Sequence, residues 1–249
     1  MRNQHTSIHA ISLLVGLSIT LTFGYPQPTP EANPAAIKDF VRQVYIEGVP
    51  YEDVGRLSAD VAIPVLREML NNPQEEEYWP NVVVTLGMLG DDRAVEPLVN
   101  FIERKEPGKQ LSRAQSVAKT SAVMALGYVV NRTGNQRALK YLEEGIYPSA
   151  WEKRNLPWAS SFFPSGAERN NQLVIMSVLG LGLSGRAEAT KVLRLLRDPH
   201  ATPEIVALKQ QVPGIDNIAD EALKASESIG KDGMRMYYKK ELQRQPPDH

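Results

Sequence analysis

Apolar residues in the central part of the chain recur with the spacing of helices that bury one face. Val82, Leu86 and Leu89 lie at i, i+4 and i+7, so they fall on one side of a helix. A second stripe follows at i, i+3, i+4 and i+7, and its members are Val95, Leu98, Val99 and Ile102. Between the two stripes, Asp91-Asp92 supplies a side chain suited to capping the second helix. The pattern predicts two antiparallel helices joined by a short turn.

The same pattern returns twice further along the chain. Leu-Gly pairs end at Gly87, Gly127 and Gly180, so the intervals are 40 and 53 residues. Each pair follows an apolar helical stretch and precedes a polar turn with Arg-Ala. The equivalent apolar positions are Ala122, Leu126 and Val129 in the second copy, and Ala189, Val192, Leu193 and Leu196 in the second helix of the third. A glycine near the end of the first helix allows neighbouring backbones to approach closely.

Weaker copies flank this central part. Residues 60–70 resemble the second helix of a pair, with residues 37–46 before them, and residues 219–229 and 234–242 form a last, more polar pair. One pair buries too little apolar surface to offset the entropy of ordering its residues, so the pairs must stack. We therefore expect an all-α fold, an α-solenoid of about four to five stacked antiparallel helix pairs, over residues 37–244.

The N-terminal residues have the layout of a secretory signal. Arg2 and His5 precede an apolar run at 8–23, and no acidic residue occurs before Glu31. We expect a signal at 1–24, cleaved before Tyr25; the alternative is a retained membrane anchor. Four prolines then indicate an extended linker at 25–36, and residues 245–249 form a C-terminal tail. The expected location is the periplasm or the extracellular medium.

An insertion separates the second copy from the third. Residues 147–168 contain three prolines, several serines and a glycine, which predict a loop. The loop is rich in aromatic residues, and as a partner-binding surface its candidate residues are Trp151, Lys153, Arg154, Trp158, Phe162 and Phe163. Alternatively, the rings fold back and fill the groove between helix pairs. The substitution Trp158→Ala distinguishes the two alternatives. If the ring belongs to the core, the substitution lowers the melting temperature. If the ring belongs to an interface, the substitution lowers only the affinity for the partner.

Composition narrows the chemistry that the chain can perform. The formal net charge is −1, which gives no reason to expect nucleic acid as a partner. There is no cysteine, and after removal of the signal only His200 and the C-terminal His249 remain of four histidines. The chain therefore has few residues that could act as nucleophiles or bases or bind a metal. We expect no cofactor, no metal site, no catalytic residue and no enzymatic activity.

The stretch at 86–98, Leu-Gly-Met-Leu-Gly-Asp-Asp-Arg-Ala-Val-Glu-Pro-Leu, resembles a HEAT repeat of the short bacterial type also found in phycobilisome lyases. The resemblance is most specific in the copy at 81–104, and extends to those at 117–144 and 172–197. It implies a curved helical stack whose concave side binds proteins. Some lyase relatives attach or remove bilins, but the export signal argues against a bilin-carrying client, and no lyase residue maps onto this chain.

Three functions follow as hypotheses. The first is an exported, non-enzymatic scaffold or adaptor that binds another protein and meets a membrane only if the signal is uncleaved. The second is a lyase-like or carboxylate-based accessory enzyme, which needs acidic residues clustered in one groove. The third is a self-associating structural subunit of an envelope complex.

Overall fold

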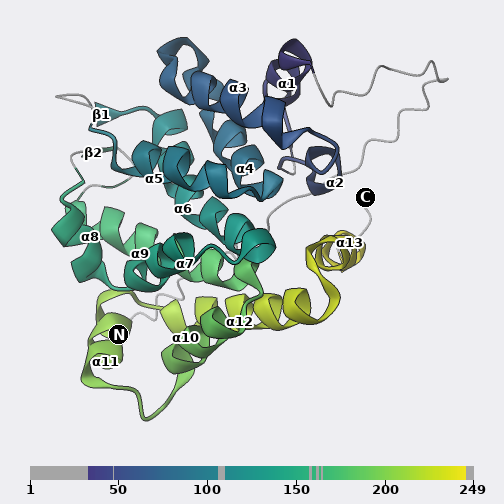
Figure 1. Cartoon of the computed structure of the whole chain (residues 1–249). Coiled ribbons are helices and arrows are strands. Elements are labelled where there is room, and N and C mark those ends of the chain that lie inside the picture. The colour runs from purple at the N-terminus through teal and green to yellow at the C-terminus, as the bar shows by residue number, and fades with distance from the viewer. Residues whose placement is uncertain are drawn as a thin grey trace, which may run out of the picture.

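The computed structural model of the chain describes residues 33–46, 48–105, 110–156, 159–160, 163 and 165–244. The predicted signal, most of the linker and the tail at 245–249 lie outside these residues. The all-α prediction is confirmed (Figure 1). In chain order the α-helices are α1 (Pro34–Val41), α2 (Tyr51–Val54), α3 (Ala59–Asn71), α4 (Trp79–Leu89), α5 (Val95–Glu103), α6 (Arg113–Thr133), α7 (Gln136–Gly145), α8 (Pro148–Arg154), α9 (Gly166–Ser184), α10 (Ala187–Arg197), α11 (Pro203–Gln211), α12 (Ile215–Asp232) and α13 (Met234–Arg244).

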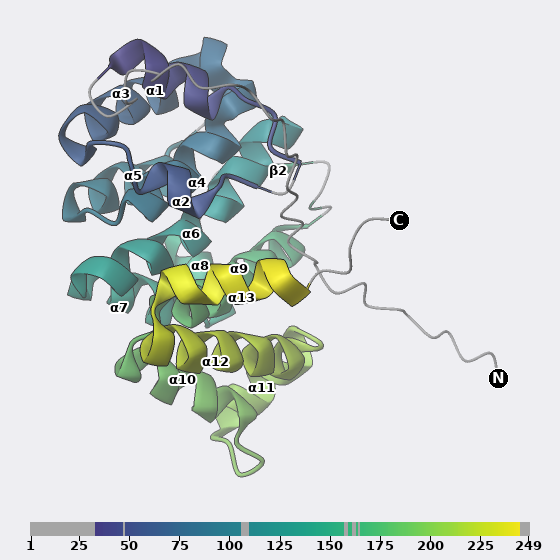
Figure 2. The same ribbon diagram turned by 90° about the vertical axis from the view of Figure 1, so that its right-hand side faces the viewer.

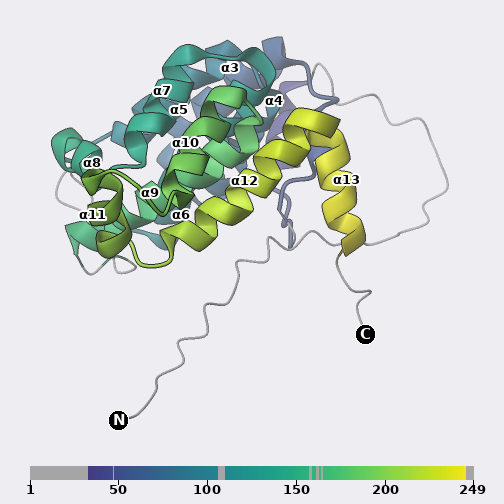
Figure 3. The same ribbon diagram turned by 90° about the horizontal axis from the view of Figure 1, so that it is seen from below.

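The helices lie in two layers that follow the order of the chain (Figures 2 and 3). In one layer α4 contacts α6, α6 contacts α9, and α9 contacts α12. The second layer consists of α3, α5, α7 and α10, which pack against the first. In Figure 2, α1 and α3 lie at the top and α10 and α11 at the bottom, whereas the last helix, α13, lies above α12 and departs from this order.

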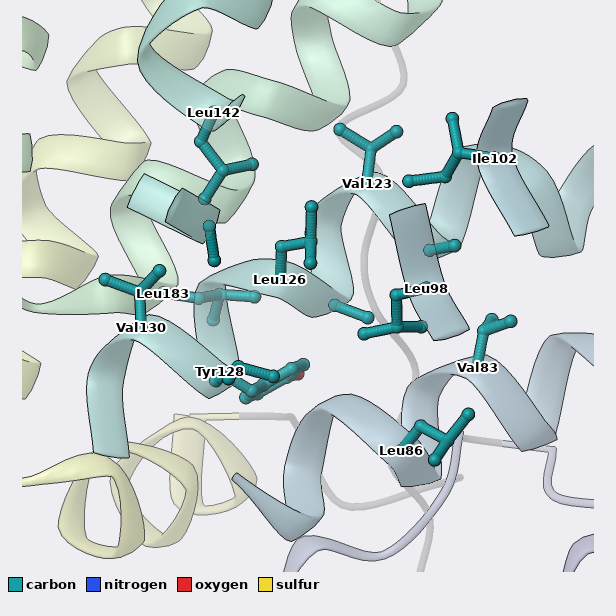
Figure 4. Packing of buried hydrophobic residues seen from close by; sticks show 14 of the residues in the cluster. Val83, Leu86, Leu98, Ile102, Val123, Leu126, Tyr128, Val130, Leu142 and Leu183 are labelled. Carbon is teal, nitrogen blue, oxygen red and sulfur yellow. The ribbon is translucent and has the colours of Figure 1, made fainter. Parts of the chain in front are cut away.

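The predicted apolar stripes form the core. Val82, Leu86 and Leu89 of α4 are buried, and so are the stripe residues of α5 and the equivalent residues of α6. Figure 4 shows Leu86, Leu98 and Leu126 converging from these three helices. In α10, Ala189, Leu193 and Leu196 are buried, whereas Val192 is only partly buried.

Local signals fix where the long helices begin and end. Ser112 starts α6 with a capping box, in which its hydroxyl accepts from the Gln115 amide and the Gln115 side chain accepts from the Ser112 amide. Ser165 and Glu168 do the same for α9. At the far end of α6, Gly134 has φ 69°, a left-handed conformation that ends the helix. The predicted cap before α5 is also present, since Asp91 Oδ1 accepts from the Arg93 amide at 2.8 Å.

Several boundaries differ from the prediction. Helix α1 begins at Pro34, inside the predicted linker, because Asn33 caps it and proline is tolerated at the first helical position. It ends at Val41 rather than residue 46, which leaves Val44 and Ile46 90% and 86% exposed. Helix α11 was not predicted at all. Each of these segments is short and lacks a repeated apolar stripe.

Two further departures concern the region of the insertion. The predicted loop at 147–168 contains α8, which starts with Pro148 and ends at Asn155 in a left-handed conformation. Ahead of α6 and α9, two-residue strands pair in parallel, β1 (Gln110–Leu111) with β2 (Ala159–Ser160). The pairing joins the segments that lead into two successive long helices, and an all-helical pattern gave no sign of it.

Candidate functional site

The first of the predicted partner-binding residues lie on α8, which packs against α7 and α9. Trp151 is fully buried there, and its indole N–H donates to the Gly145 carbonyl oxygen at 2.7 Å. Its ring meets Tyr141 of α7 edge-on, with ring centroids 5.8 Å apart. The prediction that Trp151 is a surface anchor is therefore wrong for this structure. As in the alternative prediction, the ring fills the groove between helices.

Arg154 lies over these rings. Its guanidinium carbon is 4.1 Å from the Tyr141 ring centroid and 4.5 Å from that of Trp151. It also pairs with Glu144 at 3.4 Å and Glu103 at 3.6 Å, and its side chain is only 15% exposed. Arg154 thus braces α5, α7 and α8 together, and most of its surface is already used inside the molecule.

A shallow hollow of about 690 Å³ lies beside this brace, on the surface of α7 and α8. Lys153 is exposed at its rim, and Tyr147 keeps 36% of its surface exposed. The hollow combines three basic side chains, two acidic side chains and an accessible aromatic ring, and aromatic residues are enriched at protein interfaces. It is lined by Lys140, Glu143, Glu144, Tyr147, Ser149, Ala150, Lys153 and Arg154.

One acidic group of the hollow titrates abnormally. Burial raises the pKa of Glu143 above its ordinary value, and the negative charge of Glu188 on α10 raises it further. This pair could not be predicted from the sequence, because Glu143 and Glu188 are 45 positions apart and no motif connects them. A carboxyl group whose pKa is raised by burial is a candidate general acid.

The remaining predicted residues are divided. Phe163 is half-buried and packs against the core, whereas Trp158 and Phe162 lie outside the described residues. The structure therefore brings Trp151, Lys153 and Arg154 onto one short helix and gives them three different environments. Lys153 is the member of this group that is freely available to a partner.

Sequence reasoning missed a second cluster of aromatic residues. Tyr51 of α2, Tyr128 of α6 and Tyr238 of α13 stack on one another, with ring centroids 5.2 to 6.5 Å apart. Burial raises the pKa of both Tyr128 and Tyr238, whose hydroxyl groups are in contact. Only the fold brings these residues together, since 110 positions separate Tyr128 from Tyr238.

Among the residues that the structure describes, no three His, Asp or Glu side chains gather in a metal-binding arrangement. Within these same ranges, no helix combines the length and the apolar character needed to cross a bilayer.

No family model, curated protein or solved structure matches this chain.

Proposed function

We propose that the chain is an exported α-solenoid of HEAT-like helix pairs that binds another protein and catalyses no reaction. The partner is a protein rather than a nucleic acid, because the net charge is −1 and gives no electrostatic attraction to phosphates. No cofactor is part of the proposal.

The observation that carries the proposal is a repeated contact between successive long helices. A Cβ on Gly87 of α4 would lie 2.5 Å from the carbonyl oxygen of Ala125 in α6. On Gly127 of α6 it would lie 2.2 Å from the carbonyl oxygen of Gly180 in α9. These two glycines belong to the Leu-Gly pairs, so the sequence repeat coincides with a repeat of helix crossings. A stack built in this way presents a long surface, and solenoids use such surfaces to bind proteins.

The α7–α8 hollow supplies a first docking position. Lys153 and Tyr147 extend from a rigid base, because Trp151 and Arg154 fix α8 against its neighbours. A fixed base lowers the entropy lost on binding. The other acidic and basic groups of the rim give a partner several positions for polar contacts.

Affinity capture with a matched pair of variants tests this function. The chain is immobilised and exposed to envelope extract, beside the double variant Lys153→Glu/Tyr147→Ala and the control Lys191→Glu. Lys191 is exposed on α10, so the control makes the same charge change outside the hollow. A partner retained by the wild type and the control but lost by the double variant supports the proposal. If all three proteins retain the partner equally, the hollow is not the docking position. If none of them retains a protein, the scaffold function is rejected.

Export has a separate test. The intact mass of the protein recovered from the envelope or the medium should correspond to a chain that begins at Tyr25. A mass that retains residues 1–24, or recovery from the cytoplasm alone, contradicts export with cleavage.

The Glu143–Glu188 pair favours one alternative function, a carboxylate-based accessory enzyme. A hydrolase screen of the wild type beside Glu143→Gln and Glu188→Gln tests it. If the wild type is active and both variants lose that activity, the result supports an enzyme. If both variants keep the activity, it does not depend on this pair.

A further inference from the structure

Helix α13 does not continue the stack. After α12 the chain turns back at Gly233, and α13 contacts α12 and then α2, near the beginning of the described chain (Figures 1 and 3). The first and last parts of the array therefore meet directly. A helix that merely capped the open end would lie against the outer face of α12 alone.

The contact between α13 and α2 is made by a small set of residues. Tyr238 stacks on Tyr51 with ring centroids 5.2 Å apart and planes inclined by 18°. The ring centroids of Tyr238 and of Tyr128 in α6 are 6.4 Å apart, and their planes are inclined by 20°. Three residues before Tyr238, Arg235 Nε donates to Glu52 Oε1 at 2.7 Å. Residues three apart share one side of a helix, so α13 presents a basic residue and an aromatic ring together.

This attachment is weak compared with the packing of α12. Of the α13 side chains that the structure describes, Met234 alone is buried. The Arg235–Glu52 pair is largely exposed, with 77% and 51% of the side chains accessible, and such pairs contribute about 0–1 kcal/mol. Helix α12, in contrast, buries Ile215, Ala219, Ala222, Leu223 and Ile229.

The junction between α12 and α13 is suited to a hinge. Gly233 has φ 82° and ψ 158°, a conformation that is open essentially to glycine alone. Nothing lies within 4 Å of the position that a Cβ would occupy. Gly233 can therefore change conformation without a clash of its own, whereas movement of α13 also requires Met234 to leave the core.

We propose that α13 is a displaceable strap, and that the face it covers is a docking site for a partner helix of the same chemistry. That face consists of the Tyr51 and Tyr128 rings with the Glu52 carboxylate beside them. The partner is a helix that carries Arg or Lys three residues before Tyr or Trp, because that is the arrangement which occupies the face now. The inference rests on the proposed protein-binding function and names a second docking face for it.

The titration of the tyrosines agrees with a covered face. Burial holds the pKa of the Tyr128 and Tyr238 hydroxyl groups above the ordinary value. Opening of the strap returns water to both rings, so the ionisation of these tyrosines, followed by ultraviolet absorbance, moves to lower pH.

A peptide with the sequence of residues 233–244, carrying a fluorophore, tests the proposal on the full chain. The strap is weakened by Arg235→Glu/Tyr238→Ala, which leaves Tyr51, Glu52 and Tyr128 intact. We expect this variant to bind the peptide at least tenfold more tightly than the wild type. The control Lys239→Glu changes the charge of α13 at an exposed position, and should behave as the wild type does.

Two results would overturn the proposal. One is a peptide that binds the weakened variant no better than it binds the wild type or the control. The other comes from hydrogen exchange of the wild type, which needs no variant to fold: amides of α13 that exchange as slowly as those of α12 exclude an opening strap. If the peptide binds while the capture experiment retains no protein, the strap stands and the scaffold function fails.

Discussion

Two neighbouring residues of α6 belong to two different kinds of interface. Gly127 lies where α6 crosses α9, and backbone meets backbone there without side chains between. Tyr128, the next residue, points to the other side and stacks on rings from α2 and α13. Figure 4 shows Tyr128 apart from Leu126 and Val123, which point into the stack.

The difference separates the first-layer helices α4, α6, α9 and α12 from helices that are attached to this layer. Successive long helices approach closely at glycine and alanine, as at Gly182, where a Cβ would lie 2.9 Å from the Ala222 carbonyl oxygen. Helices α8 and α13 attach through large rings instead, Trp151 and Tyr238. Small residues demand one exact spacing and recur with the repeat. Aromatic rings contribute much stability from few residues, which suits a helix added once.

The largest expected effect is at an aromatic attachment. Trp151→Ala should lower the free energy of unfolding by about 4 kcal/mol, because it removes a fully buried indole and leaves a cavity. Chemical denaturation measures the change. Lys153→Ala, two residues along the same helix but exposed, should stay within about 0.5 kcal/mol. Equal losses in the two variants would mean that α8 is not fixed by its tryptophan.

A helix crossing should be the next most sensitive position. Gly127→Ala places a methyl group against the backbone of α9, and the helices must separate, at about 3 kcal/mol. Gly166→Ala at the start of α9 is the matched control, because the nearest atom is 3.7 Å away. There alanine should be neutral or stabilise by about 0.5 kcal/mol. A neutral Gly127→Ala would contradict the close crossing.

A substitution in the strap should have a smaller and more local effect on stability. Tyr238→Ala removes one aromatic stack and should cost about 1.5 kcal/mol at most. Hydrogen exchange should speed up in α13 and α2 while α6 and α9 keep their protection. Loss of protection throughout the stack would show that α13 is part of the core.

The cap at Asp91, which starts the 3-10 turn Asp92–Ala94 ahead of α5, is worth less again. Asp91→Ala removes the acceptor for the Arg93 amide and should cost about 1 kcal/mol. Hydrogen bonding to Arg93 lowers the pKa of Asp91 below its ordinary 3.8. The stabilisation is therefore present above pH 3.8 and is lost as the pH falls through the lower, folded-state pKa. Thermal melts of both proteins between pH 2 and 7 measure it, and a difference unchanged down to pH 2 would contradict the assignment.

The smallest effect is expected at Glu143. Its pKa is raised in the folded protein, so the ionised carboxylate destabilises the fold at neutral pH, and protonation relieves this as the pH falls toward 4.5. Glu143→Gln should therefore raise the melting temperature at pH 7 and change it little at pH 4. A variant that melts lower at both values would show that the carboxylate is stabilising instead.

Structural features that recur along the chain could be predicted from the sequence, and features that occur once could not. The stripe of Val82, Leu86 and Leu89 predicted both the helix and its buried face, because helical periodicity and burial have one physical cause. The Leu-Gly pairs similarly marked the crossings at Gly87 and Gly127.

The insertion misled sequence reasoning for a physical reason. Proline at 148 favours a loop by its residue type, but it stands at the first position of α8, where no amide hydrogen bond is lost. The tyrosine cluster left no trace in the sequence, because stacking of Tyr51, Tyr128 and Tyr238 requires the whole array to be folded first.

The account depends on helix pairs that succeed one another along a single array. Since the chain has no cysteine, spin labels can be placed cleanly on Asp60→Cys combined in turn with Arg93→Cys, Arg137→Cys or Glu188→Cys, at the exposed starts of successive second-layer helices. Pulsed electron resonance then measures the three distances. The account predicts that they increase in that order, whereas a third distance no longer than the first would contradict the stacked array.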